Sequence, residues 1–255
     1  SRKLQKQNHP TLIFNDTDIL EVNNHKHLGL TMNSTLTWSE HILEICSKAC
    51  KTLNIMHALK YRLSRKALES IYTSFLRPTL EYCDVIWDNC LQKEKDLLEN
   101  IQLAAARIVT GARRGTSHAL LYEETGWNTL QERRDIHKLV MMYKIINDLA
   151  PQYLKNALPP TAGERAGRNL RNNSNLEHIK CHSTHFLNSF FPSAIKHWNQ
   201  LSVDIRQSTT LSTFKSKVSK IFSRVKPLPY YYKGNRKTGI ILACMRMGCS
   251  NLNSD

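Results

Sequence analysis

The carboxylates of this chain are poorly placed for two-metal chemistry. Enzymes that transfer phosphoryl groups with two metal ions need carboxylates that hold the ions about 4 Å apart. The sequence contains no Asp-Asp pair, and its nearest approach to one, Asp16 and Asp18, lies in FNDTD, where a hairpin turn accounts for both residues. Metal chelation is the alternative to the turn. No serine lies in a Gly-x-Ser-x-Gly turn either, and we expect no catalytic residue in this chain.

Histidine and cysteine gather at two places. His25 and His27 would share one face of a strand, which suits either two zinc ligands or a polar edge facing solvent. The segment HIKCHSTH is the better metal candidate, with His178, Cys181, His182 and His185 inside eight residues. It lacks the paired spacing of known zinc modules, so we expect no bound metal and no cofactor.

Two basic segments have the residue types that contact phosphate. In GARRGTSH, Arg113 and Arg114 lie between two glycines, just before a predicted helix start at Thr116 or Ser117. A solvated loop between helices is the alternative. In KPLPYYYKGNRK, the tyrosines Tyr230, Tyr231 and Tyr232 could stack on bases or inside the protein, while the cations Lys226, Lys233, Arg236 and Lys237 meet the backbone.

The charge of the chain favours a polyanionic partner. The 255 residues include 36 Lys and Arg against 21 Asp and Glu, a net charge of +15. Residues 1–160 hold 21 basic and 17 acidic side chains, whereas residues 161–255 hold 15 and 4, so most of the excess lies in the last third. Nucleic acid is the leading interpretation, because dispersed Lys and Arg neutralise phosphates. Simple solubility is the alternative, and an anionic membrane surface fits less well.

Cysteine content and hydropathy bear on the compartment. Seven cysteines at irregular positions favour a reducing compartment and free thiols over a disulfide framework. The sequence has no uninterrupted apolar run near twenty residues, and it begins at Ser1 without a charged and apolar leader. We therefore expect an intracellular protein, nuclear or cytoplasmic, with no membrane partner, and we expect the chain to be a fragment or processed piece.

Residue periodicity predicts a mainly helical fold after a short β region. TLIFNDTDILEV indicates a hairpin, and HKHLGLTM can supply a third strand. Helices are predicted over 38–60 behind a Thr37/Glu40 capping box, from Ser64 to a kink or end at Pro78, over about 92–110 up to Gly111, and behind a second capping box at Thr129 and Glu132. In the second of these helices the expected apolar stripe is Leu68, Ile71 and Phe75. The four tryptophans, Trp38, Trp87, Trp127 and Trp198, are expected to be packing anchors.

The later part of the chain is predicted to hold a linker followed by two helices. PPTAGERAGRNLRNNSN, residues 159–175, offers almost no side chain to a core and is typical of a mobile basic linker. Two further helices should follow, one around SAIKHWNQL and one with Phe214, Val218, Ile221 and Phe222 on one face.

Motifs along most of the chain resemble the segment after the catalytic core in reverse transcriptases of non-LTR retrotransposons, in particular jockey-like LINE elements. The resemblance is carried in order by HKHLGL with TWSEHI, RPTLEYCDVIW, IQLAAARIVTGARRGTSHALLYEETGW, LQERRDIHKLVMMYKIIND, APQYL, RNLRN, NSFFPSAIKHWNQL and FKSKV. It covers about residues 20–222. YYYKGNRKTGI and RMGCSNLNSD also resemble the family's approach to a Cys/His-rich segment, which this sequence does not contain.

The resemblance implies a role in holding template and primer. HLGL matches the aromatic-Leu-Gly position of the last palm strand, so His27, Leu28 and Gly29 would grip the primer end, with His27 in place of the usual tyrosine. The family's catalytic Asp-Asp hairpin and its Mg²⁺ ions belong upstream, so this chain alone should not polymerise.

The expected organisation and partners follow from the same resemblance. The regions are palm-edge strands (1–37), a thumb-like helical bundle (38–150), a basic linker (151–184), a C-terminal helical region (185–225) and a basic tail (226–255). The expected partners are an RNA–DNA or DNA duplex, the element RNA, and the fingers and palm of the same polyprotein. The alternative is a free-standing basic helical module that binds nucleic acid without a polymerase.

Overall fold

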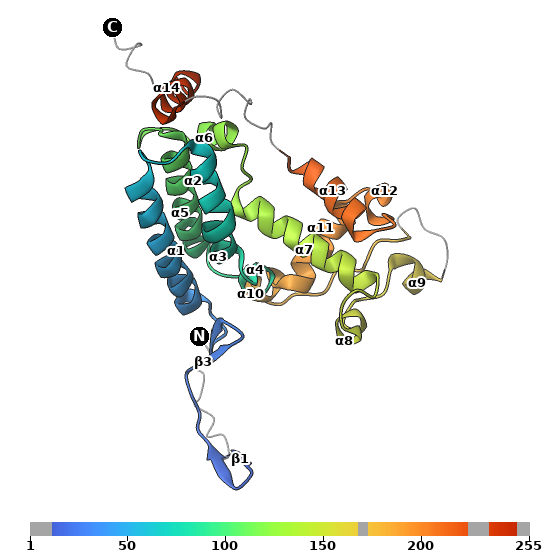
Figure 1. The fold of residues 1–255 in the computed structure, drawn as a ribbon. Helices are drawn as coiled ribbons and strands as arrows, with labels where there is room; N and C mark the ends of the chain where they lie inside the picture. The colour runs from blue at the N-terminus through green and yellow to red at the C-terminus, as the bar shows by residue number, and fades with distance from the viewer. Residues whose placement is uncertain (1–11, 168–172, 224–234, 249–255) are drawn as a thin grey trace.

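The computed structural model describes residues 12–167, 173–223 and 235–248, and it confirms a mainly helical fold with short N-terminal hairpins (Figure 1). The strands are β1 (Leu12–Phe14), β2 (Thr17–Ile19), β3 (Asn24–His27) and β4 (Leu30–Asn33). The helical elements are α1 (Ser39–Leu59), α2 (Arg65–Ile71), the π-helical turn η1 (Tyr72–Leu76), α3 (Arg77–Glu81), α4 (Asp84–Trp87), α5 (Gln92–Thr110), α6 (His118–Thr125), α7 (Leu130–Ile146), α8 (Gln152–Asn156), α9 (Ala162–Ala166), α10 (Thr184–Leu187), α11 (Phe190–Gln200), α12 (Val203–Arg206), α13 (Leu211–Ile221) and α14 (Arg236–Arg246). Across the described ranges, no helix has both the length and the apolar character needed to cross a bilayer.

The N-terminal strands form two separate antiparallel hairpins, β1–β2 and β3–β4. Asn15 and Asp16 turn the first hairpin with positive φ values of 47° and 58°, as predicted for Asp16, whereas Asp18 lies in β2 opposite Ile13. The predicted third strand HKHLGLTM is instead the second hairpin. Leu28 and Gly29 take φ values of 46° and 83°, and this left-handed pair reverses the chain where one continuous strand was expected.

The start of α1 differs from the expected capping box. Thr37 does not cap the helix, because its hydroxyl oxygen accepts a hydrogen bond from Asn33 Nδ2 at 2.6 Å. Trp38 is the N-cap residue, and its carbonyl accepts the N–H of Ile42 at 2.9 Å. By contrast, Ser64 caps α2 and Thr129 forms the predicted capping box with Glu132 at the start of α7.

The second helix does not end at Pro78, and a π-helical turn directly precedes the helix that contains this proline. The N–H of Arg77 donates to the carbonyl of Tyr72, five residues back, and α3 then continues through Pro78. The wider turn also shifts the buried face. Leu68, Tyr72 and Leu76 are buried, whereas Phe75 of the expected apolar stripe is 64% exposed.

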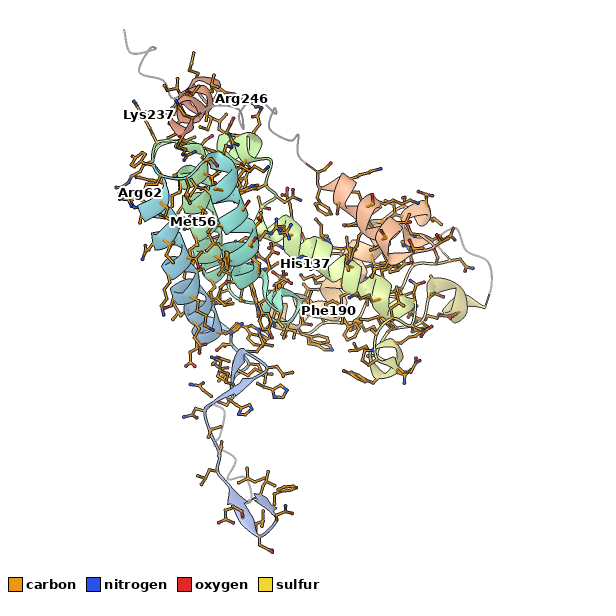
Figure 2. All side chains as sticks on the ribbon, viewed as in Figure 1. Met56, Arg62, His137, Phe190, Lys237 and Arg246 are labelled. Carbon is orange, nitrogen blue, oxygen red and sulfur yellow. The ribbon has the colours of Figure 1, made fainter. Side chains whose placement is uncertain are left out.

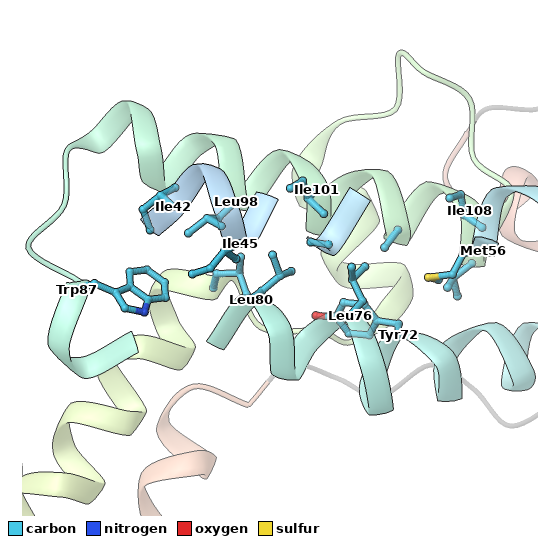
Figure 3. Packing of buried hydrophobic residues seen from close by; sticks show 14 of the residues in the cluster. Ile42, Ile45, Met56, Tyr72, Leu76, Leu80, Trp87, Leu98, Ile101 and Ile108 are labelled. Carbon is cyan, nitrogen blue, oxygen red and sulfur yellow. The ribbon is translucent and has the colours of Figure 1, made fainter. Parts of the chain in front are cut away.

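The first core lies between α1, α2 to α3, and α5 (Figure 3). Ile42 and Ile45 of α1 face Leu98 and Ile101 of α5, and Trp87 closes one end. The tryptophans pack as expected: Trp38, Trp87 and Trp198 are buried, and the half-buried Trp127 stacks on Tyr72 with ring centroids 3.7 Å apart.

A second core places α7 against α11 and α13. Leu139 and Tyr143 of α7 pack with Trp198 and Phe214, and Tyr143 stacks on Phe214 at 4.4 Å. The expected boundary at residue 150 therefore does not separate the cores, because α7 contributes to both the bundle and the C-terminal helices (Figure 1).

Part of the expected linker is folded. Thr161 and Glu164 form the capping box of α9. Thr161 also forms a β-bridge to Leu176, which is 8% exposed and packs in the second core. Residues 168–172 of this segment lie outside the described residues. The expected basic tail also contains structure, since α14 packs against α5 and α6 through Ala243 and Met247. In both segments, a few apolar side chains within a polar stretch pack the segment onto a core.

Candidate nucleic-acid interface

A basic cleft of about 690 Å³ lies at the end of the bundle where α1 and α5 terminate and α14 crosses. Figure 2 shows Arg62, after the last turn of α1, and Lys237 of α14 at this end of the molecule. The polar walls are formed by Asn54, His57, Lys60, Tyr61, Arg107, Arg114 and Arg236, and the apolar floor includes Leu53, Ile108 and Ile240. Among the described residues that line this cleft, none is Asp or Glu. We refer to it as the basic cleft.

His57 in the last turn of α1 and Lys60, the residue that follows the helix, both line the basic cleft. Lys60 Nζ lies 3.3 Å from His57 Nε2, and it also lies over the ring of Tyr61, 4.7 Å from the ring centroid. Tyr61 itself is 74% exposed. An exposed aromatic ring beside cations is the combination that contacts both the bases and the phosphates of a nucleic acid.

Arg107 comes from the last turn of α5 and lines the same cleft. Its Nε is buried and has no hydrogen-bond partner among the described atoms. A buried donor without a partner costs free energy. Sequence reasoning missed Arg107, His57 and Lys60, although HALKYR and ARIVTGARR place cations at the ends of two predicted helices.

The two loop arginines differ in position. Both Arg113 and Arg114 are exposed, but only Arg114 lines the basic cleft. The N–H of Thr116 donates to the carbonyl of Arg113 at 3.2 Å, and Ser117 caps α6, as the sequence predicts for a helix start there. The structure thus brings Arg114, but not Arg113, together with the cations of α1 and α5.

Arg236 lies in the basic cleft but is mainly a packing residue, which corrects its predicted role. Its Nε donates to the carbonyl of Lys60 at 3.0 Å, and its terminal nitrogens donate to the carbonyls of Ile108 and Val109. Burial lowers the pKa of Arg236, and the charge of Arg65 lowers it further. The guanidinium therefore caps the ends of α1 and α5 and fixes α14 as one wall of the cleft.

We predict that Arg236→Gln loosens α14. Three hydrogen bonds from a charged donor are lost, and their carbonyl acceptors at two helix ends are left without this donor. The free energy needed to open α14 should therefore fall by about 2–3 kcal/mol. Amide hydrogen exchange of residues 236–246 measures this directly. Lys237→Gln is the matched control, because it removes the same charge from the exposed neighbouring residue. Equal protection of α14 in both variants would contradict this role of Arg236.

The predicted primer-grip residues form a turn at the opposite end of α1. His27 is exposed, and the hydroxyl of Tyr82 donates to the carbonyl of Leu28 at 2.7 Å. A Cβ on Gly29 would lie 3.2 Å from Tyr82 Cε1, so the ring packs directly on the glycine. The hairpin precedes the start of α1 and the basic cleft lies at its end, so α1, with 21 residues, keeps the two sites about 30 Å apart (Figure 1).

The histidine and cysteine segments do not form a metal site in the described ranges. Within these ranges, no group of three or more His, Cys, Asp or Glu side chains is arranged to hold an ion. Of the candidate set His178, Cys181, His182 and His185, the three histidines are exposed, His185 contacts Asn89 Nδ2 at 3.1 Å, and Cys181 Sγ donates to the carbonyl of Ile179. His25 and His27 are exposed with ring centroids 6.2 Å apart.

The remaining residues predicted to contact nucleic acid are one described residue and five that lie outside the described residues. Lys237 is exposed on α14, outside the lining of the basic cleft. Lys226, Tyr230, Tyr231, Tyr232 and Lys233 lie outside the described residues. The six cysteines in the described ranges are free thiols, as expected.

Comparisons with protein-family models, with curated proteins and with solved structures found no match to this chain.

Proposed function

We propose that this chain binds the sugar–phosphate backbone of an RNA–DNA or DNA duplex, as the template–primer-binding part of a non-LTR retrotransposon reverse transcriptase. The observation that carries the proposal is the basic cleft, where Lys60, Arg107 and Arg114 converge from three segments and the described lining holds no acidic residue. Cations in this arrangement neutralise successive phosphates and give affinity with little sequence preference. The motif resemblance supports the polymerase context.

The chemistry of nucleotide addition is assigned to the upstream part of the parent enzyme. Phosphoryl transfer requires carboxylates that hold Mg²⁺, which the resemblance places before this segment. The chain contributes binding, and we propose that it does not extend a primer alone.

A free-standing nucleic-acid-binding module is the second candidate, because the basic cleft would serve it equally well. The two candidates differ in what the gene encodes before Ser1. An Asp-Asp hairpin in the same reading frame supports the polymerase, whereas a start codon near Ser1 with no polymerase core before it supports the module.

A photocrosslink tests where the duplex lies. Tyr61 at the basic cleft and Tyr153 on α8 are 74% and 70% exposed, so each can be replaced by p-benzoylphenylalanine with little effect on packing. With a labelled RNA–DNA hybrid, we expect a crosslink from position 61 and none from position 153. Crosslinking from position 153 alone, or equally from both, would refute the assigned binding face.

A further inference from the structure

A second cleft, of about 470 Å³, lies between the end of α7, the turn before α9, and α11 with α12. Its apolar walls are Ile146, Leu158, Pro159, Leu176, Trp198 and Val203. A volume of this size lies within the range of small-molecule sites, which are mostly apolar with a few polar groups that orient the ligand. We refer to it as the Trp198 cleft.

One cation in the Trp198 cleft has an unused donor. Arg206 Nη1 donates to the carbonyl of Ser174 at 3.2 Å and to Asn175 Oδ1 at 2.9 Å, which fixes the guanidinium. Its Nε is buried and has no hydrogen-bond partner among the described atoms. Burial lowers the pKa of Arg206, and no described carboxylate forms an ion pair with it. The half-buried guanidinium of Arg206 therefore lines the cleft without an ion-pair partner among the described carboxylates.

The other charged groups of the cleft already have partners. Lys155 Nζ forms an ion pair with Asp148 at 2.6 Å. Glu164 accepts hydrogen bonds from the N–H and hydroxyl of Thr161 at 2.7 and 2.9 Å, in the capping box of α9. Among the described residues of this lining, Arg206 is thus the cation without an ion-pair partner, which favours an anionic ligand over a cationic one.

We propose that the Trp198 cleft binds small molecules that combine an apolar body with one carboxylate. The carboxylate would pair with the guanidinium of Arg206, and the apolar body would cover Leu158 and the ring of Trp198. A neutral ligand of the same shape would leave the guanidinium without an anion, so the cleft should bind the acid more tightly than the neutral compound. This inference is independent of nucleic-acid binding at the basic cleft.

The test compares 4-phenylbutyrate with the neutral 4-phenyl-1-butanol by calorimetric titration of the full chain. We expect the acid to bind about tenfold or more tightly than the alcohol, because only the acid satisfies a charged donor. Arg206→Gln should remove this preference, and Leu158→Trp, which fills the cleft, should weaken both ligands.

Two controls keep the outcome interpretable. Lys196→Gln removes an exposed charge from α11 and should leave the preference unchanged. Arg206→Lys keeps the charge, so it should retain part of the preference, and thermal unfolding of each variant establishes that it is folded. The proposal is overturned if wild-type protein binds neither compound at millimolar concentration, if it binds them equally, or if Arg206→Gln keeps the full preference.

Discussion

Asp88→Ala should lower the free energy of unfolding by about 3–5 kcal/mol, because it leaves buried cations without their anion. Asp88 is 2% exposed, and Arg134 and Lys138 of α7, which form ion pairs with it, are 2% and 3% exposed. Lys95 of α5 adds a third ion pair at 3.1 Å, and Lys138 Nζ also donates to Ser193 of α11 at 2.8 Å. This network joins the two cores, so its loss should also free α7 from the bundle.

Chemical denaturation measures the effect, with Asp96→Ala as the matched control. Asp96 is an exposed acid on α5, and its loss should change stability by less than about 0.5 kcal/mol. Similar values for the two variants would show that the Asp88 network does not hold the cores together.

The same network predicts that the stability of the fold depends on pH. Burial alone would raise the pKa of Asp88, but Lys138, Arg134 and Lys95 hold it below its ordinary value of 3.8. A carboxyl with a lowered pKa in the folded state stabilises the fold fully above its ordinary pKa, and loses this contribution as the pH falls through the lowered one. The stability difference between wild type and Asp88→Ala should therefore be constant near neutral pH and narrow below pH 3.8.

The second large effect is expected at the basic cleft. Changing Lys60, Arg107 and Arg114 together to Gln should weaken binding of an RNA–DNA hybrid about 100-fold, since three charge-assisted contacts of roughly 1 kcal/mol each are lost. The loss should be similar for unrelated sequences, because phosphate contacts do not read bases.

A matched triple variant distinguishes the cleft from net charge. Lys93→Gln, Lys196→Gln and Lys215→Gln remove the same charge from exposed positions on α5, α11 and α13. Lys93 lies at the start of the helix that carries Arg107 near its end, about 20 Å away. We expect this variant to bind within a few-fold of wild type, and an equal loss in both variants would show that only total charge matters.

Local patterns predicted most of the long helices. Thr129 and Glu132 capped α7 as expected, and Gly111 ended α5 with a φ of 78°. The turn at Leu28 and Gly29 was missed because the apolar alternation of HKHLGLTM also fits one strand. Leu68 was predicted correctly, but the burial of Tyr72 and Leu76 in place of Phe75 was missed because a π-helical turn adds a residue that periodicity does not show.

The basic cleft could not be predicted because it is assembled from distant segments. Arg236 contacts the carbonyl of Lys60 across 176 residues, and α14 reaches α5 through a few apolar side chains within a basic stretch. Sequence reasoning predicted a nucleic-acid partner from charge, which stays a prediction, and it singled out Arg114, which lines the cleft, from its loop. It placed Arg236 among phosphate contacts, because residue type does not show that its donors bind helix carbonyls.

The salt dependence of hybrid binding tests the central claim most directly, that the basic cleft neutralises phosphates. For wild-type protein, about five phosphate contacts predict a slope near −4 in a plot of log affinity against log salt. The Lys60, Arg107 and Arg114 triple variant should reduce the magnitude of this slope by about 3, while the Lys93, Lys196 and Lys215 variant should keep it. An unchanged slope in the cleft variant, or an affinity of wild-type protein that does not vary with salt, would contradict the account.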